Sequence, residues 1–90
     1  MDRKREIALD IHAIIRTEFC CDKDFFENAS LCDDYQVAPG VMRFLIRKLC
    51  KIWGLKVAVP LRKLLLASTE DKIRRVTISD LAGVIHQVCG

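Results

Sequence analysis

Basic side chains are the groups in this chain whose number and spacing favour a chemical role. Residues 35–69 contain no Asp or Glu. The bases in this stretch are Arg43, Arg47, Lys48, Lys51, Lys56, Arg62 and Lys63. Guanidinium and ammonium groups attract anions, so this patch favours an acidic protein, a nucleic acid or a membrane surface as partner. The alternative is a solvated helix face that binds nothing.

Residues suited to catalysis are few. The adjacent carboxylates Asp33 and Asp34 lack a neighbour of complementary chemistry, and the chain has neither a Ser/His/Asp set nor a glycine-rich phosphate loop. The sequence therefore predicts no enzyme, no catalytic residue and no cofactor.

Five cysteines could bind metal or form disulfides, but their spacing favours neither. The chain has no C-x-x-C pair, their number is odd, and His12 and His86 lie far from any cysteine cluster. We expect reduced thiols and no metal site, with Cys50 packed as a small apolar residue. Adjacent Cys20 and Cys21 are not expected to bridge each other. A zinc site remains the alternative.

A central helix from Pro39 to Trp53 is predicted to carry the densest group of bases. Proline suits the first position of a helix, because its φ is already helical and its missing N–H would have no partner there. Apolar residues at helical spacing form the predicted buried stripe: Val41, Met42, Leu45, Ile46, Leu49, Ile52 and Trp53.

The other face of this helix is the candidate partner-binding surface. Arg43, Arg47 and Lys51 are spaced by four residues and should form one row, with Lys48 and Phe44 beside it. The helix itself contains no acid to offset these charges. We call these five residues the basic ridge.

Three further helices are expected around the central one. The first covers Arg5–Phe19, a short third covers Pro60–Ala67, and the last runs from Thr77 to about Val88. Thr77 and Asp80 have the T-x-x-D form of a capping pair at a helix N-terminus. Gly54 can end the central helix, because glycine adopts a positive φ without strain.

The connecting segments are predicted to be loops. Phe25, Phe26 and Leu31 should anchor the long loop after the first helix in the core. Residues 68–75, STEDKIRR, should form a polar loop. His12 is expected at the surface or its boundary. The prediction is therefore an all-α four-helix bundle formed by a single domain over residues 1–90.

The chain has no signal that favours a membrane-spanning segment or an export route. No apolar run approaches the roughly 20 residues needed to cross a bilayer. The basic start of the sequence is not followed by an apolar segment, because Asp10 and His12 interrupt it. We therefore expect a cytoplasmic protein.

Four short stretches resemble acyl carrier proteins in their residue types, and they follow one another in the same order as in that family. Residues 28–31 (NASL) look like the N-A-S-F that precedes the carrier motif, and residues 33–35 (DDY) lie where the family has E-D-L. Residues 53–57 (WGLKV) resemble F-G-I-x-I, and residues 77–81 (TISDL) resemble the T-V-x-D-L that opens the fourth helix. An insertion would lie between Val57 and Thr77. The resemblance implies a carrier-type bundle of three main helices and one short helix.

The serine that defines carrier proteins is missing from this sequence. In the family it lies in a D-S-L motif and carries 4′-phosphopantetheine, whereas the matching residues here are Ala38, Pro39 and Gly40. Proline has no hydroxyl with which to form the phosphodiester, so we expect no prosthetic group. The charge also differs, because the second helix of the family is usually acidic and the matching helix here is basic.

The resemblance and the charge together predict a non-catalytic protein-interaction or regulatory module. Its basic ridge would bind an acidic partner, for example a genuine acyl carrier protein or an enzyme of acyl metabolism. The alternative is a small basic helical nucleic-acid-binding protein, although the ridge has no Asn or Gln to read base edges. The sequence leaves the oligomeric state open.

Overall fold

A computed structural model describes residues 2–19, 22, 24–66 and 69–89. These residues form five α-helices: α1 (Arg3–Phe19), α2 (Met42–Trp53), α3 (Ala58–Leu65), α4 (Glu70–Arg75) and α5 (Ile78–Cys89). Two short 3₁₀ helices, η1 (Pro39–Val41) and η2 (Leu55–Val57), precede α2 and α3. The described part of the chain contains no strand, and its one β-bridge pairs Ser30 with Thr77. The all-α prediction is confirmed.

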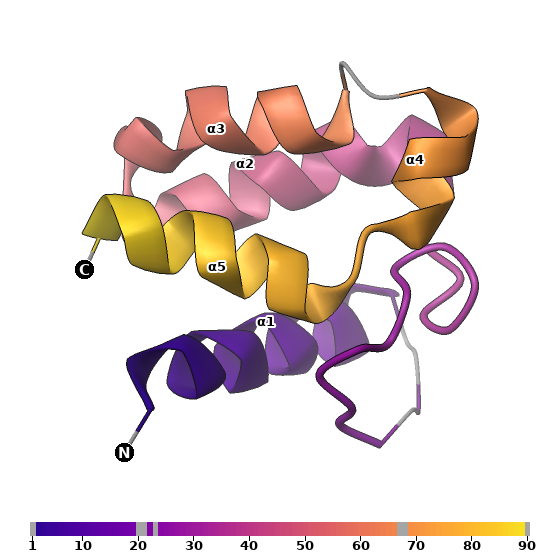
Figure 1. The fold of residues 1–90 in the computed structure, drawn as a ribbon, viewed down its shortest axis with the longest axis horizontal. Coiled ribbons are helices and arrows are strands. Elements are labelled where there is room, and N and C mark those ends of the chain that lie inside the picture. Colours follow the sequence, from indigo (N-terminus) through magenta and orange to yellow (C-terminus); the bar gives the residue numbers. More distant parts are fainter. Residues whose placement is uncertain (1, 20–21, 23, 67–68, 90) are drawn as a thin grey trace.

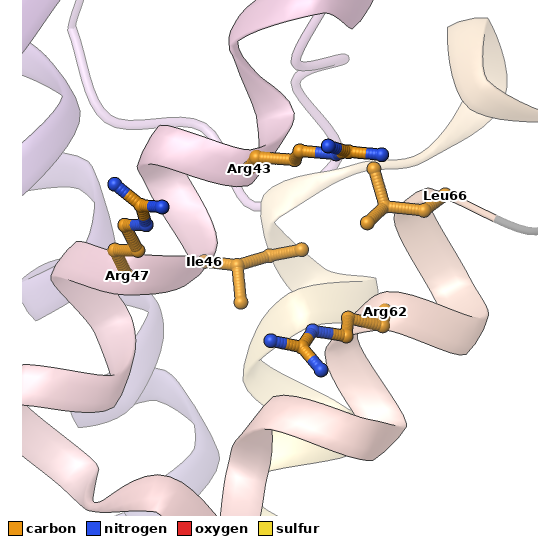
Figure 2. Close-up of a pocket in the computed structure, with 5 residues that line it drawn as sticks. All are labelled: Arg43, Ile46, Arg47, Arg62 and Leu66. Carbon is orange, nitrogen blue, oxygen red and sulfur yellow. The ribbon is translucent and has the colours of Figure 1, made fainter.

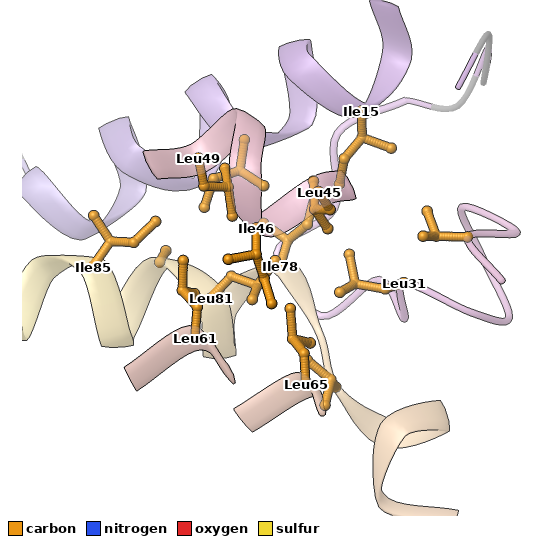
Figure 3. Packing of buried hydrophobic residues seen from close by; sticks show 14 of the residues in the cluster. Ile15, Leu31, Leu45, Ile46, Leu49, Leu61, Leu65, Ile78, Leu81 and Ile85 are labelled. Atoms are coloured by element: carbon orange, nitrogen blue, oxygen red, sulfur yellow. The ribbon is translucent and has the colours of Figure 1, made fainter. Parts of the chain in front are cut away.

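Helices pack in two pairs around one core (Figure 1). α1 lies against α5, and α2 lies against α3 and η2, while α5 also contacts η2 and α3. Side chains from α1, α2, α3, α5 and the long loop meet in the centre (Figure 3). Within the described ranges, no helix is long and apolar enough to span a membrane.

The start and end of the central helix follow the sequence prediction. Pro39 is the first residue of η1, which leads directly into α2. Gly54 ends α2 with a φ of +96°, a value that a residue with a β-carbon adopts only under strain. At the start of α5, the Thr77 and Asp80 side chains each accept a hydrogen bond from the other residue's backbone N–H, at 3.2 and 3.0 Å. These three local predictions are confirmed.

The predicted loop at residues 68–75 is wrong, so the described chain has five α-helices rather than four. Residues 70–75 form α4, whose N-cap Thr69 accepts a hydrogen bond from the backbone N–H of Lys72 at 3.4 Å. Glu70 and Asp71 lie in the first turn, where carboxylates favour a helix. The predicted Pro60–Ala67 helix is α3, which begins earlier, at Ala58. Pro60 is tolerated in its first turn, because an N–H group at that position would have no partner within the helix. Ala67 and Ser68 lie outside the described residues.

Three apolar residues that were expected in the core lie at the surface instead. The exposed fractions are 57% for Ile52, 37% for Val41 and 59% for Phe26. Phe25 occupies the inner position in the long loop, with its ring centroid 5.5 Å from that of His12. The remaining predicted anchor, Leu31, is fully buried as expected.

Backbone hydrogen bonds fix the long loop to the segment before α5. The N–H of Leu31 donates to the carbonyl of Val76 at 3.0 Å, and the N–H of Ile78 donates to that of Ala29 at 3.2 Å. The Ser30 hydroxyl donates to the carbonyl of Arg74 at 2.6 Å. The loop is therefore part of the folded core, which places Pro39 at a defined start of α2.

His12 is buried, which contradicts the predicted surface or boundary position. It is 7% exposed, and its Nδ1 lies 2.8 Å from the hydroxyl oxygen of Tyr35. On α1 it shares the inner face with Ala8, one turn earlier, and Ile15, one turn later. The Tyr35 hydroxyl provides the hydrogen bond that a buried imidazole requires. The contact joins α1 to the long loop.

Acid is expected to destabilise the domain through His12. Burial lowers the pKa of His12 below its ordinary value of 6.5, and Arg16 lowers it further, while Asp24 acts in the opposite direction. The unfolded chain then binds a proton at His12 more readily than the folded chain does. The contribution of neutral His12 to the free energy of unfolding is therefore fully present above pH 6.5 and is lost as the pH falls below this value. Urea unfolding at about pH 7.5 and 5.5 measures this loss. The loss should shrink in His12→Gln; an unchanged loss in that variant would exclude this histidine as its source.

Candidate functional site: an arginine cleft between two helices

A cavity of about 380 Å³ lies between α2 and α3 and is lined mainly by arginines. Arg43, Ile46 and Arg47 come from α2, Arg62 comes from α3, and Leu66 follows α3 directly. Figure 2 shows Arg43 extending from α2 toward Leu66, and Arg62 extending from α3 back toward α2. We call this site the arginine cleft.

The local sequence explains why these side chains line the same cavity. Arg43 and Arg47 are one turn apart on α2, next to the buried row that contains Ile46, which is 3% exposed. On α3, Leu61 points into the core, and the next residue, Arg62, is turned outward. The contact between α2 and α3 then brings Arg62 to the cavity that Arg43 and Arg47 line. Ile46 and Leu66 give the cleft an apolar wall.

Among the residues that the structure describes, no acid balances the charge of the cleft. Its lining residues include no carboxylate. Among the described residues, none forms an ion pair with Arg43, Arg47 or Arg62, whereas Arg3, Arg16 and Arg74 each pair with an acid. A guanidinium group is always charged and presents a planar fork of donors that fits carboxylate and phosphate oxygens. The cleft is therefore chemically suited to bind an anion.

The predicted basic ridge does not form one uniform surface. Lys48 pairs with Glu18 of α1 at 3.4 Å. Although α2 itself contains no acid, an acid from a neighbouring helix therefore neutralises one of its bases. The ammonium of Lys48 also lies 5.2 Å from the ring centroid of Phe44. That ring packs edge-on against Phe19, with centroids 6.2 Å apart, and remains 43% exposed. Lys48 and Phe44 therefore help to join α2 to α1.

Lys51 lies at a different cavity from the two arginines of the ridge. It lines a depression of about 390 Å³ between α1 and α2, together with Lys48, Glu18 and the exposed Ile52. Each step of four residues turns about 40° around the helix axis, so Lys51 lies about 80° around α2 from Arg43, with Arg47 between them. The structure thus brings Arg43 and Arg47 together but separates them from Lys51.

Arg62 is the site residue that the ridge prediction missed. The sequence signal for it was its place in the acid-free stretch 35–69. That signal does not distinguish Arg62 from Lys56 or Lys63, because only the packing of α3 on α2 selects the residue that reaches the cleft.

A second polar cavity, of about 390 Å³, lies where the carrier-protein resemblance would put a prosthetic group. Pro39 lines it together with Cys32, Glu70 and Arg74. Burial raises the pKa of the Cys32 thiol, and the nearby Asp33 raises it further, while Arg74 acts in the opposite direction. The thiol is therefore protonated at neutral pH, which makes it a poor nucleophile or metal ligand.

Three of the five cysteines belong to the described ranges. Cys32, Cys50 and Cys89 are free thiols. In residues 2–19, 22, 24–66 and 69–89, no three His, Cys, Asp or Glu side chains are grouped so that they could hold a metal ion. Cys20 and Cys21 lie outside these ranges.

No family model, curated protein or solved structure matches the chain. The geometry and charge of the arginine cleft therefore carry the functional proposal.

Proposed function

We propose that this domain is a non-catalytic protein-interaction module that binds an acidic partner through the arginine cleft. The observation that carries the proposal is that Arg43, Arg47 and Arg62 line one cavity whose described lining residues include no carboxylate. A genuine acyl carrier protein or an acidic enzyme of acyl metabolism is the partner class that fits a carrier-like domain. The domain itself carries no phosphopantetheine.

The energetics of the free domain support a role in binding. Arg43 and Arg47 lie at i,i+4 on α2, where two like charges cost about 0.2–0.5 kcal/mol. Arg62 adds a third positive charge at the same cavity. An anion bound between them would offset this repulsion and add charge-assisted hydrogen bonds. The same charges would steer an acidic protein toward this face.

The order of helices supports the carrier-like part of the proposal. A long first helix, a long loop, a central helix and a final helix opened by Thr77 and Asp80 follow one another as the resemblance implies. Pro39 lies at the start of the central helix, where the family has its serine. The segment between Val57 and Thr77, where the resemblance requires an insertion, contains two helices, α3 and α4, instead of one short helix. Arg62 lies on the first of them, α3.

A nucleic-acid partner is less well matched to this site. The arginines line a cavity between two packed helices, with Ile46 and Leu66 on its wall, rather than a helix face free to enter a groove. A partner that offers carboxylates next to apolar side chains matches both parts of this lining.

Binding to defined anionic probes tests the proposal. Fluorescence anisotropy would compare three labelled probes: a purified acidic acyl carrier protein, a Glu-rich peptide with interspersed Leu residues, and duplex DNA. We expect both acidic polypeptides to bind more tightly than DNA at about 50 mM and at about 200 mM salt, since DNA binding through phosphates falls steeply in this range. If DNA bound more tightly than both acidic polypeptides at both salt concentrations, that result would contradict the proposal.

A further inference from the structure

The arginine cleft has two opposed walls that each present a guanidinium group. Arg43 extends from α2 and Arg62 extends from α3, on the two sides of the cavity (Figure 2). A single arginine fork can bind both oxygens of a carboxylate side by side. The remaining lone pairs of these oxygens can accept from a second arginine, but the carboxylate brings only one negative charge for two guanidinium groups. A phosphate monoester provides three terminal oxygens and nearly two negative charges at neutral pH.

We propose that the arginine cleft recognises a phosphoserine or phosphothreonine residue in an acidic partner, with an apolar neighbouring residue placed against Ile46 and Leu66. This inference rests on the proposed acidic-partner function and specifies the group that the partner presents. Arg43 and Arg62 hold the phosphoryl group from opposite walls. Arg47, one turn along α2, adds positive charge at the rim.

The size and lining of the cleft favour a phosphorylated peptide over other phosphates. A volume of about 380 Å³ exceeds what a phosphate ion alone would fill, so part of a peptide can enter with it. Phosphodiesters of nucleic acids carry one negative charge and two free oxygens per phosphate, which matches the opposed arginines less well. Ile46 and Leu66 provide apolar contact on one side, which a free ion would leave unused.

A titration of the 90-residue chain with short peptides tests this inference. The probe is acetyl-Leu-phosphoSer-Leu-amide, and the comparison probes are acetyl-Leu-Glu-Leu-amide, acetyl-Leu-Ser-Leu-amide and inorganic phosphate. Backbone and arginine side-chain NMR shifts report both affinity and location. At equal ionic strength and about pH 7.5, we expect the phosphopeptide to bind about tenfold more tightly than the Glu peptide or phosphate, with shifts in α2 and α3. At about pH 5, where the phosphate keeps one charge, its advantage over the Glu peptide should fall several-fold.

Two variants locate the site without removing the fold. Arg62→Gln should weaken phosphopeptide binding about tenfold, since it removes one wall of the clamp. Lys63→Gln removes the same charge from the next exposed residue, which does not line the cleft, and should leave the affinity within about twofold. Equal effects of the two substitutions would overturn the inference, because binding would then depend on net charge alone. Since both residues are exposed, both variants should keep the thermal stability of the parent chain.

The remaining outcomes separate this inference from the proposed function. Equal affinity for the phosphopeptide and the Glu peptide would overturn the phosphate assignment while leaving an acidic-protein partner in place. Binding of inorganic phosphate as tightly as the phosphopeptide would overturn the peptide assignment. Vesicles containing phosphatidic acid serve as a last probe. Binding to them without binding to either peptide would overturn both proposals and assign the cleft to a lipid headgroup.

Discussion

Replacing Leu45 with alanine is expected to lower the free energy of unfolding by about 2–5 kcal/mol, and Leu49→Ala should cost a similar amount. Both side chains are fully buried on α2 and belong to the central apolar cluster (Figure 3). The substitution removes apolar contacts and leaves a cavity that the surrounding helices fill only in part. A 90-residue domain has about 5–15 kcal/mol of stability, so a large share would be lost. Urea or thermal unfolding measures the change.

Ile52→Ala is the matched control for these core variants. Ile52 lies on the same helix and also fits the apolar spacing of the sequence, but it is 57% exposed. Its truncation should change stability by no more than about 0.5 kcal/mol, as is usual for surface positions. If Ile52→Ala proved as costly as Leu45→Ala, the orientation of α2 described above would be wrong.

The sequence predicted those parts of the fold that depend on local chemistry. Pro39 and Gly54 mark the two ends of the central helical segment, because each has a backbone preference that acts within one turn. Thr77 and Asp80 open α5 for the same reason, since their hydrogen bonds join residues three apart. Such signals need no knowledge of the other helices.

Predictions that depended on tertiary contacts were less successful. Ile52 matches the apolar repeat of α2, yet it is 57% exposed. Periodicity predicts which residues share a helix face, but not how much of that face another helix covers. His12 lies on the inner face of α1 because Tyr35, distant in sequence, supplies a hydrogen bond there. α4 was missed because its six residues contain one apolar side chain, Ile73, and so show no helical repeat.

The candidate site shows the same division between local and tertiary information. Arg43 and Arg47 could be grouped from their spacing of four on one helix. Lys48 looked equivalent to them, but Glu18 on α1 neutralises it. Arg62 joins the cleft from α3, and only the α2–α3 packing brings it there. The sequence thus predicted an anion-binding surface, and the structure places three bases of the acid-free stretch at one cavity.

Reversing the charge of Arg43, Arg47 and Arg62 to Glu is expected to cost about 3 kcal/mol in binding free energy to an acidic polypeptide. Each exposed charge pair contributes up to about 1 kcal/mol, so three lost pairs correspond to roughly a hundredfold increase in Kd. Repulsion between the new carboxylates and the acidic partner adds to this loss and slows association. The free domain should keep its stability, because these arginines have no ion-pair partner among the described residues to lose.

A matched triple variant distinguishes the cleft from net charge. Arg5, Lys56 and Lys72 are exposed bases that do not line the cleft. Their replacement by Glu changes the net charge by the same amount as the reversal of the three arginines. The long-range effect of exposed charges outside the cleft is screened at about 0.15 M salt, where the Debye length is about 8 Å.

The most direct test of an acidic-partner site in the arginine cleft is the Kd of the Glu-rich peptide for the parent chain and these two triple variants at about 0.15 M salt. We predict that the Kd values of the parent chain and of the variant with Glu at positions 5, 56 and 72 agree within a few-fold. The cleft variant should have a Kd roughly a hundredfold higher. Equal affinities for the two triple variants would contradict the central claim, because the cleft would then have no role beyond its contribution to net charge.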